Sequence, residues 1–350
     1  MQVANKTHKG EKGRRPSARA KPFDARNRSS AREEGDRVAA ETPEHGATVI
    51  TGICGRLGQL LARELHRCDR VIGIDRRPFE GCPEDIVHYQ LDLRRNKTQD
   101  VFRSNAVKAV VHLGIMHNLR ENDREHHSWN VVGFKKILEY VEQYRVPKLI
   151  LLSSANLYGP NPENPQFLSE EAPLLGAQDF SQIRDLVDVD MLAQSFFWKR
   201  PQTETVILRP CHILGKVRNA PSNYLRLKRP ITLLGYDPMM QVIHERDVVD
   251  AIVHALKPGQ RGIFNLSGAG QLPLSRLIRM LNKPAIPLPA PLVKSAMRRL
   301  WSYRVSDYSA PEFDHLRYTC MVDGSRALEQ LGFRPSRGIR ETLEAVYNEV

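Results

Sequence analysis

The amino-acid sequence predicts a doubly wound α/β fold, in which a parallel sheet is covered by helices on both faces, with a smaller interwoven C-terminal lobe. From residue 47 to about residue 215, short apolar runs alternate with helical patterns. These runs show little two-residue alternation, as expected when both faces of a sheet are covered. A glycine-rich turn and an amphipathic helix directly follow the first run. Such βαβ order is typical of a parallel sheet.

Six strands are expected in this first part. They are Thr48–Thr51, Val71–Ile74, Ile86–Leu91, Ala109–Leu113, Leu149–Leu152 and Thr205–Leu208. Apolar residues at helical spacing predict helices at Leu57–His66 and at about Glu125–Tyr144. In a sheet of this kind, ligands bind outside the carboxyl ends of the strands.

The pattern changes after residue 215, where Pro, Gly and short apolar stretches mix. The expected elements are a strand at Gln241–His244, a helix opened by Asp247 as N-cap, a strand at Gly262–Leu266, a helix near Leu274–Leu281 and a basic amphipathic helix at Leu292–Tyr303. We expect residues 47–215 to form the first domain and residues 216–350 a smaller lobe that is partly interwoven with it. The last helix could lie on an anionic membrane, but we favour packing over the substrate cleft.

The glycines of the first turn form a Rossmann-type fingerprint from Gly52 to Gly58. Gly52 allows a tight turn, Gly55 lets the backbone approach a pyrophosphate, and Gly58 lets the helix pack on the strand. The N–H groups at the start of the helix then face the phosphates. Asp75 follows the second apolar run and is placed to accept hydrogen bonds from the adenosine ribose. The order of strand, turn, helix and carboxylate disfavours an ordinary glycine-rich turn. We therefore expect residues 47–215 to be a dinucleotide-binding domain and residues 216–350 to be the substrate-binding lobe.

The basic residues are concentrated in an N-terminal tail, residues 1–46. The chain has a net charge of +12, yet residues 1–32 hold ten basic and two acidic side chains. This segment is too poor in apolar residues to order itself, so we expect a disordered extension. A polyanion-binding arm and a wrongly assigned start codon remain as alternatives, and any nucleic-acid contact is expected through this tail.

Cysteine usage and hydropathy favour a cytoplasmic protein. The five cysteines are scattered and form no C-x-x-C pair, which argues against a disulfide framework and against a zinc site. No run reaches the roughly 18 apolar residues that a membrane span needs. The tail also lacks the apolar region of a secretory signal. We therefore expect no metal and no membrane span.

Further motifs follow the fingerprint in a fixed order. They are Leu91-Asp92-Leu93, Val110-Val111-His112-Leu113-Gly114, Asn130-Val131-Val132-Gly133, Ser153-Ser154-Ala155-Asn156-Leu157-Tyr158-Gly159, Leu208-Arg209-Pro210, Val242-Ile243-His244-Glu245-Arg246-Asp247 and Leu331-Gly332-Phe333-Arg334-Pro335. From about residue 47 to its C-terminus, the chain resembles the extended short-chain dehydrogenase/reductases of the NAD-dependent epimerase/dehydratase family. It is most similar to bacterial members labelled possible sugar (UDP-glucose 4-epimerase-like) epimerases, some of which have lost active-site residues.

The resemblance implies a set of cofactor-binding residues. They are Gly52, Ile53, Cys54, Gly55, Arg56, Leu57, Gly58, Asp75, Arg76, Asp92, Leu93, Leu113, Gly114, Asn130, Ser153, Arg184 and Pro210. Asp92 and Leu93 would contact the adenine, and Leu113 and Gly114 would line the pyrophosphate and ribose. Ser154 would orient the reacting oxygen of the substrate.

The identity of the cofactor depends on Asp75 and its neighbours. We expect NAD, because a carboxylate at this position repels a 2′-phosphate. Arg76 and Arg77 follow directly and could still accommodate NADP.

The family's proton carrier is absent from its expected place. The resemblance puts the family's Y-x-x-x-K motif at Phe180 to Arg184. Phe180 has no titratable proton, and Arg184 could only hydrogen-bond ribose hydroxyls. A Y-x-x-x-K sequence does occur at residues 144–148, but it precedes the Ser154 strand and contains a proline, so we interpret it as helix-end and loop residues. Tyr158 falls at the family's structural tyrosine position.

Other candidates for proton transfer are weaker. His212 follows Leu-Arg-Pro and could transfer a proton, although a lone histidine is more often structural. Asp179 and Asp185 flank the lost motif. Cys54 is interpreted as a small filler rather than a reactive thiol. Met240 stands where sugar-nucleotide epimerases commonly place an arginine for the diphosphate.

Two main functional hypotheses follow. The first is an NAD-binding oxidoreductase or epimerase that acts by hydride transfer on a sugar, nucleotide-sugar or polyol-like substrate. The second is a catalytically weak or inactive dinucleotide-binding pseudoenzyme, a sensor or scaffold. RNA binding is a weaker third possibility that rests mainly on charge. The resemblance also implies a homodimer, formed through the helices that carry Asn130 and Arg184.

Overall fold

The computed structural model describes residues 46–116, 122–176, 181–293, 295 and 310–347. The basic tail, Asp179, Phe180 and most of the expected helix 292–303 lie outside the described residues. Across the described ranges, no helix is long and apolar enough to cross a membrane.

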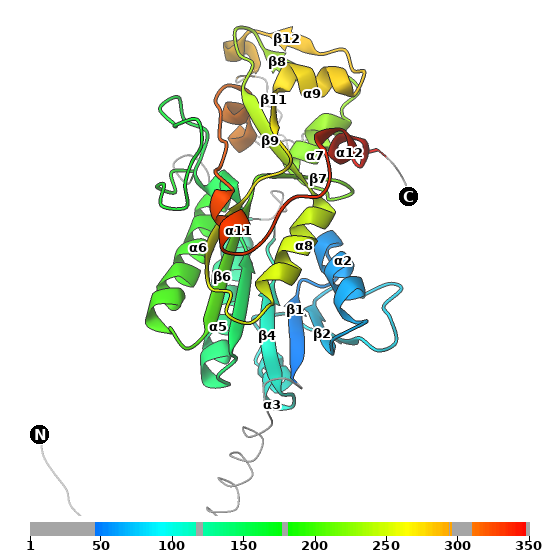
Figure 1. The fold of residues 1–350 in the computed structure, drawn as a ribbon, viewed down its shortest axis with the longest axis vertical. Helices are drawn as coiled ribbons and strands as arrows, with labels where there is room; N and C mark the ends of the chain where they lie inside the picture. The colour runs from blue at the N-terminus through cyan, green and yellow to red at the C-terminus, as the bar shows by residue number, and fades with distance from the viewer. Residues whose placement is uncertain (1–45, 117–121, 177–180, 294, 296–309, 348–350) are drawn as a thin grey trace, which may run out of the picture. The chain divides into compact units, whose positions relative to one another are not determined.

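A seven-stranded, fully parallel sheet forms the centre of the described chain (Figure 1). Its spatial order is β10 (Gly262–Leu266), β6 (Glu204–Pro210), β5 (Lys148–Leu152), β4 (Val107–His112), β1 (Ala47–Thr51), β2 (Val71–Asp75) and β3 (Val87–Gln90). All six strands expected in the first part are present, and their ends differ from the expected bounds by at most two residues. The doubly wound parallel α/β fold is therefore confirmed.

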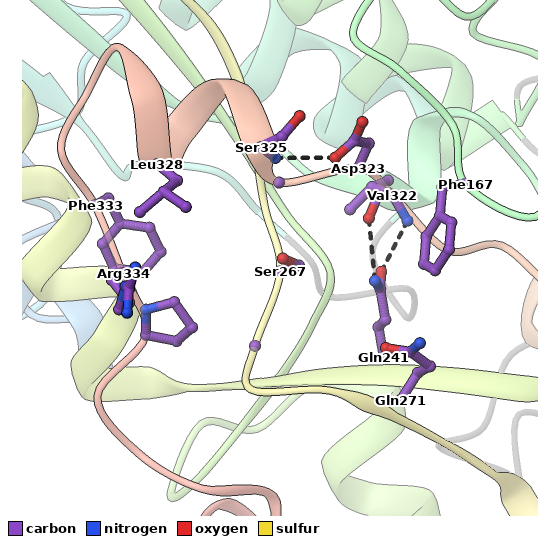
Figure 2. Close-up of a pocket in the computed structure, with 13 residues that line it drawn as sticks. Phe167, Gln241, Ser267, Gln271, Val322, Asp323, Ser325, Leu328, Phe333 and Arg334 are labelled. Atoms are coloured by element: carbon purple, nitrogen blue, oxygen red, sulfur yellow. Dashed lines mark hydrogen bonds between the residues drawn. The ribbon is translucent and has the colours of Figure 1, made fainter.

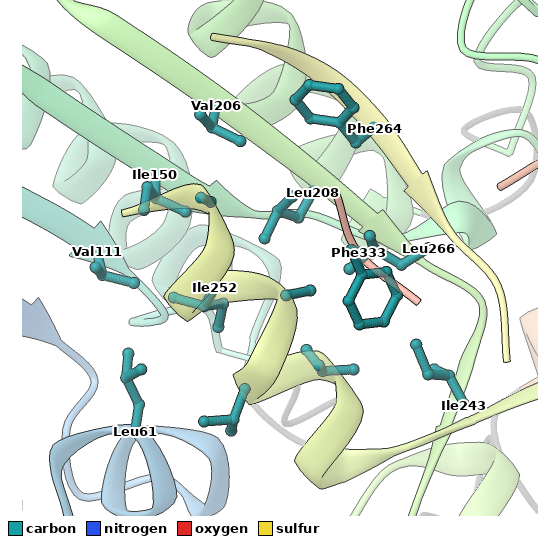
Figure 3. Close-up of a cluster of buried hydrophobic side chains, with 14 of the residues drawn as sticks. Leu61, Val111, Ile150, Val206, Leu208, Ile243, Ile252, Phe264, Leu266 and Phe333 are labelled. Atoms are coloured by element: carbon teal, nitrogen blue, oxygen red, sulfur yellow. The ribbon is translucent and has the colours of Figure 1, made fainter. Parts of the chain in front are cut away.

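Helices cover both faces of this sheet. Helices α2 (Arg56–Leu65) and α8 (Glu245–Ala255) pack on one face, and α3 (Lys97–Arg103), α5 (Gly133–Gln143) and α6 (Ser181–Lys199) pack on the other. Figure 3 shows the first face, where Leu61 and Ile252 meet Val111, Ile150 and Val206 of the strands. Along β1, β2, β5 and β6, neighbouring residues point to opposite faces and nearly all are buried, which explains why these strands show no polar alternation. The edge strand β3 is more exposed.

The crevice for a ligand lies at the carboxyl ends of β1 and β4. The chain runs from β1 outward through β2 and β3, then returns to β4 on the other side of β1. In a doubly wound sheet this reversal of strand order leaves a crevice. The glycine turn after β1 and the segment after β4 both lie there.

The second half of the chain is interwoven with the first. Two small sheets and two helices pack around an apolar cluster of their own. These elements are β11 (Gln271–Pro273), β9 (Met239–His244), β7 (His212–Leu214), β12 (Ile286–Leu288), β8 (Ile231–Leu233), α7 (Ala220–Arg226) and α9 (Leu274–Met280). Between them the chain returns to the large sheet, where α8 covers one face and β10 extends the edge beside β6.

The helix expected at 125–144 contains a change of helical type. The structure has α4 (Asp123–His127), a π-helical segment at Ser128–Val132, and then α5. A π-helical turn widens the helix locally and often marks a functional site. Apolar spacing alone did not reveal it.

The expectation that Asp247 opens a helix is wrong. Helix α8 begins two residues earlier, at Glu245, and its N-cap is His244, whose Nδ1 accepts the Arg246 N–H at 3.0 Å. Asp247 is buried inside the first turn and pairs with Arg337 at 2.6 Å. The imidazole of the preceding strand residue takes the capping role that is usual for a carboxylate.

Candidate cofactor and active site

Two glycines bring helix α2 directly onto the ends of β1 and β4. Gly52 has φ +73°, and a Cβ there would lie 2.7 Å from Gly114 Cα. A Cβ on Gly58 would lie 2.5 Å from the Gly52 carbonyl oxygen and 2.7 Å from Ile53 Cα. Neither position has room for a side chain. The positive φ at Gly52 is the left-handed conformation that glycine adopts readily.

The amino-terminal end of α2 is suited to an anion. Its N-cap, Gly55, makes no side-chain capping bond, and its first turn carries no acidic residue. The first N–H groups of a helix have no partner within the helix, and its dipole favours negative charge. A Cβ on Gly55 would approach Gly52 O at 3.2 Å and the Arg77 guanidinium at 3.7 Å. The donors and the missing side chain at Gly55 fit the pyrophosphate of a dinucleotide.

Asp75 ends β2 as expected, but its carboxylate already has partners. It accepts hydrogen bonds from the Cys54 N–H at 3.1 Å, the Arg77 N–H at 3.0 Å and the Arg77 side chain at 2.9 Å. Burial alone would raise the pKa of Asp75, but the hydrogen bonds and charge of Arg77 outweigh it and lower that pKa. Asp75 is therefore ionised at neutral pH, and a ribose must share it with Arg77.

The same arrangement recurs one strand further out, at Asp92. Its carboxylate is held at 2.6 Å by Arg94, again two residues later in the chain, and Arg94 also binds Glu125 at 2.9 Å. The guanidinium groups of Arg76 and Arg94 lie over the Trp129 ring, 4.8 and 5.5 Å from its centroid. The expected adenosine end thus combines two carboxylates with arginines, an arrangement that the motif spacing did not reveal.

The side chain of Arg56 pairs with a residue of α8 rather than with the expected phosphate site. It binds Glu245 at 2.6 Å, and Glu245 is buried at the start of α8 and also accepts the Val217 N–H at 3.0 Å. This pair links α2 to α8 across 189 residues of sequence. The side chain of Arg56 is therefore engaged mainly with Glu245, and its backbone N–H lies at the start of α2.

The other expected cofactor residues shape the crevice. Asn130 holds the segment after Gly114, since its side chain accepts the Met116 N–H at 2.8 Å and donates to the Met116 carbonyl at 3.1 Å. Ile53 fills a space left by Gly73, where a Cβ would lie 2.4 Å from it. Leu93 and Gly114 are buried, Leu57 and Leu113 are partly buried, and Pro210 pairs with the end of β10.

Cys54 is a small packing residue rather than a reactive thiol. Burial, with the nearby Asp75 carboxylate, raises the pKa of the thiol to about 12. The thiolate is the nucleophilic form of cysteine. Cys54 therefore stays protonated at neutral pH and offers no reactive group to a ligand.

Ser153 and Ser154 follow the carboxyl end of β5. Ser154 Oγ accepts the Asn156 N–H at 3.1 Å and caps the short helical turn that follows. It is partly exposed, so its own proton can be donated to a ligand. Ser153 Oγ instead donates to the buried Asp190 at 2.5 Å, so its side chain is committed to helix α6.

A buried polar network holds α6 to the sheet. Asp190 and Arg209 are 0% and 1% exposed, and their side chains form a bidentate pair at 2.7 and 3.1 Å. Arg209 also donates to the Tyr158 hydroxyl at 2.8 Å, and Tyr158 donates to Asn265 at 2.8 Å. Tyr158 is thus structural, as the sequence predicted.

Arg184 lies away from the face of α6 that meets β5. That face is marked by Asp190, which contacts Ser153, and Leu186 lies one turn earlier on the same side. Arg184 precedes Asp190 by six residues, about 120° around a helix with 3.6 residues per turn, and it is exposed. Its contact with a cofactor ribose stays a prediction, and Phe180 lies outside the described residues.

His212 is a buried, neutral imidazole. Its Nδ1 has no hydrogen-bond partner in the described part of the chain, and its ring packs edge-on against His315 with centroids 5.1 Å apart. Burial lowers the pKa of His212 to about 4, and burial with the neighbouring His212 lowers that of His315 to about 3. The two rings line a small cavity of about 30 Å³ with Tyr224 and Met240. A base with so low a pKa is inefficient at neutral pH.

We expect stability to fall as pH drops because of these buried imidazoles. Unfolded histidine binds a proton below about pH 6.5, whereas folded His212 binds one only near pH 4. Between these values the unfolded state holds more protons, which costs roughly 1.4 kcal/mol per pH unit for each histidine. Urea unfolding at pH 7, 6 and 5 should show a shallower decline for His212→Asn than for the native chain. His8→Gln, in the tail, should match the native slope, and an unchanged slope in His212→Asn would contradict burial as a neutral group.

The Y-x-x-x-K sequence at residues 144–148 joins α5 to β5, so the expectation of helix-end and loop residues holds for Tyr144 to Pro147 and not for Lys148. Tyr144 ends α5, and Lys148 begins β5. Lys148 Nζ donates to the carbonyls of Ala255 at 3.0 Å and Lys257 at 2.5 Å, and so caps the carboxyl end of α8. The same Y-x-x-x-K spacing recurs at residues 224–228. The Tyr224 hydroxyl there donates to the Ile231 carbonyl at 2.8 Å.

A larger pocket lies among the C-terminal segments, and none of the expected site residues lines it. Figure 2 shows this cavity of about 320 Å³. Gln241 of β9 spans one side, where its side chain donates to the Val322 carbonyl at 3.0 Å and accepts the Val322 N–H at 2.8 Å. The polar groups of the Gln241 side chain are therefore largely hydrogen-bonded to the backbone of Val322.

Comparison with known proteins gives a consistent result. A family model described as the NAD dependent epimerase/dehydratase family matches residues 48–267. An uncharacterised protein of Mycobacterium tuberculosis is 26% identical over 312 residues, covering 85% of this chain and 82% of its own length. A UDP-glucose 4-epimerase of Yersinia pestis is 25% identical over 286 residues, covering 72% and 79%.

One of the similar solved structures is a UDP-glucuronic acid 4-epimerase from Bacillus cereus in complex with NAD. It matches with a TM-score of 0.68 and 17% identity, covering 85% of this chain and 96% of its own. At that identity, the likeness supports the fold.

Proposed function

The chain belongs to the NAD dependent epimerase/dehydratase family, and from this premise we propose that it binds NAD at the carboxyl ends of β1 and β4. The observation that carries the proposal is the contact between Gly52 and Gly114 beneath the uncapped start of α2. The backbone N–H groups after Gly55 would hold the pyrophosphate. Asp75 would accept a ribose hydroxyl, and Asn130 would keep the segment after Gly114 in place.

Calorimetry of the full chain with NAD and NADH tests this proposal. We expect a saturable heat with one site per chain for at least one redox form. Binding should survive removal of residues 1–45, because the cofactor residues begin at β1. Absence of heat with both nucleotides would overturn the proposal.

For the substrate, we propose a nucleotide-sugar or a related polyol. The support is the family and the relatives named for UDP-sugar epimerisation. Bound NAD would supply a hydride acceptor. The Ser154 hydroxyl would orient the reacting oxygen of the substrate by donating a hydrogen bond to it. A panel of UDP- and dTDP-sugars and polyols, followed by product analysis and by absorbance of reduced nicotinamide, tests this step. Turnover that is unchanged in Ser154→Ala would contradict the role of Ser154.

A second candidate function is a weakly active or inactive NAD-binding protein. It is favoured by the state of the candidate proton carriers: His212 is buried with a pKa of about 4, and Cys54 has a pKa of about 12. The resemblance in sequence places Phe180 where the family has its tyrosine. If the native chain binds NAD but turns over no sugar, and Phe180→Tyr with Arg184→Lys gains activity, this second function is the better description.

The preference between NAD and NADP provides a further prediction. The ionised Asp75 should repel a 2′-phosphate, whereas Arg77, which is more than half exposed, should attract it. In Asp75→Asn, the repulsion is gone and Arg77 remains. We expect the ratio of Kd for NADP to Kd for NAD to fall by about tenfold, equivalent to about 1.4 kcal/mol. Calorimetry with both nucleotides measures this ratio, and Asp85→Asn, at an exposed carboxylate outside the crevice, is the control.

We also propose a homodimer formed through α6. Met191 and Trp198 of this helix are 57% and 75% exposed and lie seven residues apart, on one face. Light scattering should show a dimer for the native chain and a monomer for Trp198→Glu. Leu234→Glu, at an exposed leucine of the C-terminal half, should remain dimeric. A native monomer would refute this proposal.

A cytoplasmic location stays a prediction.

A further inference from the structure

One buried carboxylate in the described part of the chain pairs with imidazoles, whereas the others pair with arginine. Six Asp and Glu side chains are buried in the described ranges. Five pair with arginine: Asp75 with Arg77, Glu170 with Arg326, Asp190 with Arg209, Glu245 with Arg56 and Asp247 with Arg337. The sixth is Asp185 of α6, whose ion-pair partners among the described residues are two imidazoles. A buried carboxylate needs a compensating positive charge.

The groups around Asp185 converge from two helices. His126 Nδ1 lies 2.8 Å from one carboxylate oxygen and His127 Nδ1 lies 2.6 Å from the other, both from α4. Asp188 follows Asp185 by three residues, so both lie on one side of α6. The ligand atoms of His127, Asp185 and Asp188 all lie within 4.8 Å of one another. His127 is half exposed and Asp188 partly exposed, which leaves the cluster open to solvent on one side.

We propose that His127, Asp185 and Asp188 bind a divalent transition-metal cation of the Zn²⁺ type. Imidazole and carboxylate are common ligands of Zn²⁺, and three protein ligands leave a fourth position for water. The carboxylates of Asp185 and Asp188 are anionic ligands whose charge such a cation balances. Mg²⁺ is less suited, because it prefers six oxygen ligands in octahedral geometry.

His126 is assigned as a positioning residue. It is 1% exposed, so it has no access to solvent. Its ring holds the second oxygen of Asp185, as partners of ligating carboxylates commonly do. Ligand atoms on a tetrahedral Zn²⁺ lie about 3.4 Å apart, from bond lengths of about 2.1 Å. His127 and Asp185 therefore need to separate by less than about 1 Å. The cation would link α4 to α6 whether or not the chain binds NAD.

The test is Zn²⁺ binding to the metal-free full chain at pH 7.5, measured by competition with a chromophoric chelator. Other histidines and cysteines can also bind Zn²⁺, so the difference between variants is decisive. We expect the native chain to bind one more equivalent than Asp188→Asn and His127→Gln. Both positions are partly or largely exposed, so these variants should fold. His66→Gln removes a matched His–Asp pair, His66 with Asp85 at 3.0 Å on the surface, and should bind as the native chain does.

Two further measurements complete the test. Co²⁺ should give visible d–d absorption in the native chain that is lost in His127→Gln. His126→Gln should weaken Zn²⁺ binding by about 10- to 100-fold without changing its stoichiometry. Equal stoichiometry in the native chain, Asp188→Asn and His127→Gln would overturn the proposal. So would the absence of Zn²⁺ binding in the native chain.

Discussion

The Gly58→Ala variant is expected to lose both stability and NAD binding. A Cβ at this position would lie 2.5 Å from the Gly52 carbonyl oxygen and 2.7 Å from Ile53. These are backbone atoms, so helix α2 must move away from β1 to make room. Such overpacking costs typically about 1–3 kcal/mol, and the shift also moves the N–H groups that would hold the pyrophosphate. Urea unfolding and calorimetry with NAD measure the two losses.

Gly55→Ala separates the two effects. Its Cβ would approach Gly52 O at 3.2 Å and the end of the flexible Arg77 side chain at 3.7 Å, so the fold should tolerate it. The methyl group would lie at the helix start, where backbone and phosphate need close approach. We expect native-like unfolding with NAD binding weakened tenfold or more. Native NAD affinity in both variants would show that the cofactor binds elsewhere.

The sequence predicted the elements whose signals are local. The inner strands were recognisable because each is a short run buried on both faces. The glycine turn was recognisable because neither Gly52 nor Gly58 has room for a side chain. The motif identified Gly58 as a helix–strand contact. The structure adds how tight that contact is, since a Cβ there would lie 2.5 Å from the Gly52 carbonyl oxygen and 2.7 Å from Ile53 Cα.

The partners of the charged side chains were not predictable. Arg56 pairs with Glu245, 189 residues away, and no local pattern specifies that contact. Arg77 was considered only as a group for a 2′-phosphate, yet it holds Asp75, because the chain turns back just after β2. The residue that caps α8 was not predictable either. Both His244 and Asp247 can cap a helix, and His244 does so because β9 ends at this residue.

The Asp190→Asn variant is expected to be among the least stable single substitutions of a polar residue in this chain. Asparagine keeps the shape of the side chain but removes the charge that balances Arg209, which is 1% exposed. Breaking a buried ion pair by removing one partner costs about 3–5 kcal/mol, because the other charge stays buried and unpaired. Ser153 would also lose an ionised acceptor. Urea unfolding at pH 7 measures the loss.

Two companions make the experiment decisive. Asp100→Asn breaks an exposed pair with Arg103, in which both side chains are more than half exposed, and should change stability by less than about 1 kcal/mol. Replacing both Asp190 and Arg209, as Asp190→Leu with Arg209→Met, should recover part of the loss, because no unpaired charge remains. A loss below about 1 kcal/mol in Asp190→Asn would mean that water reaches Arg209. The junction of α6 with β5, beside Ser154, would then be looser than the buried network implies.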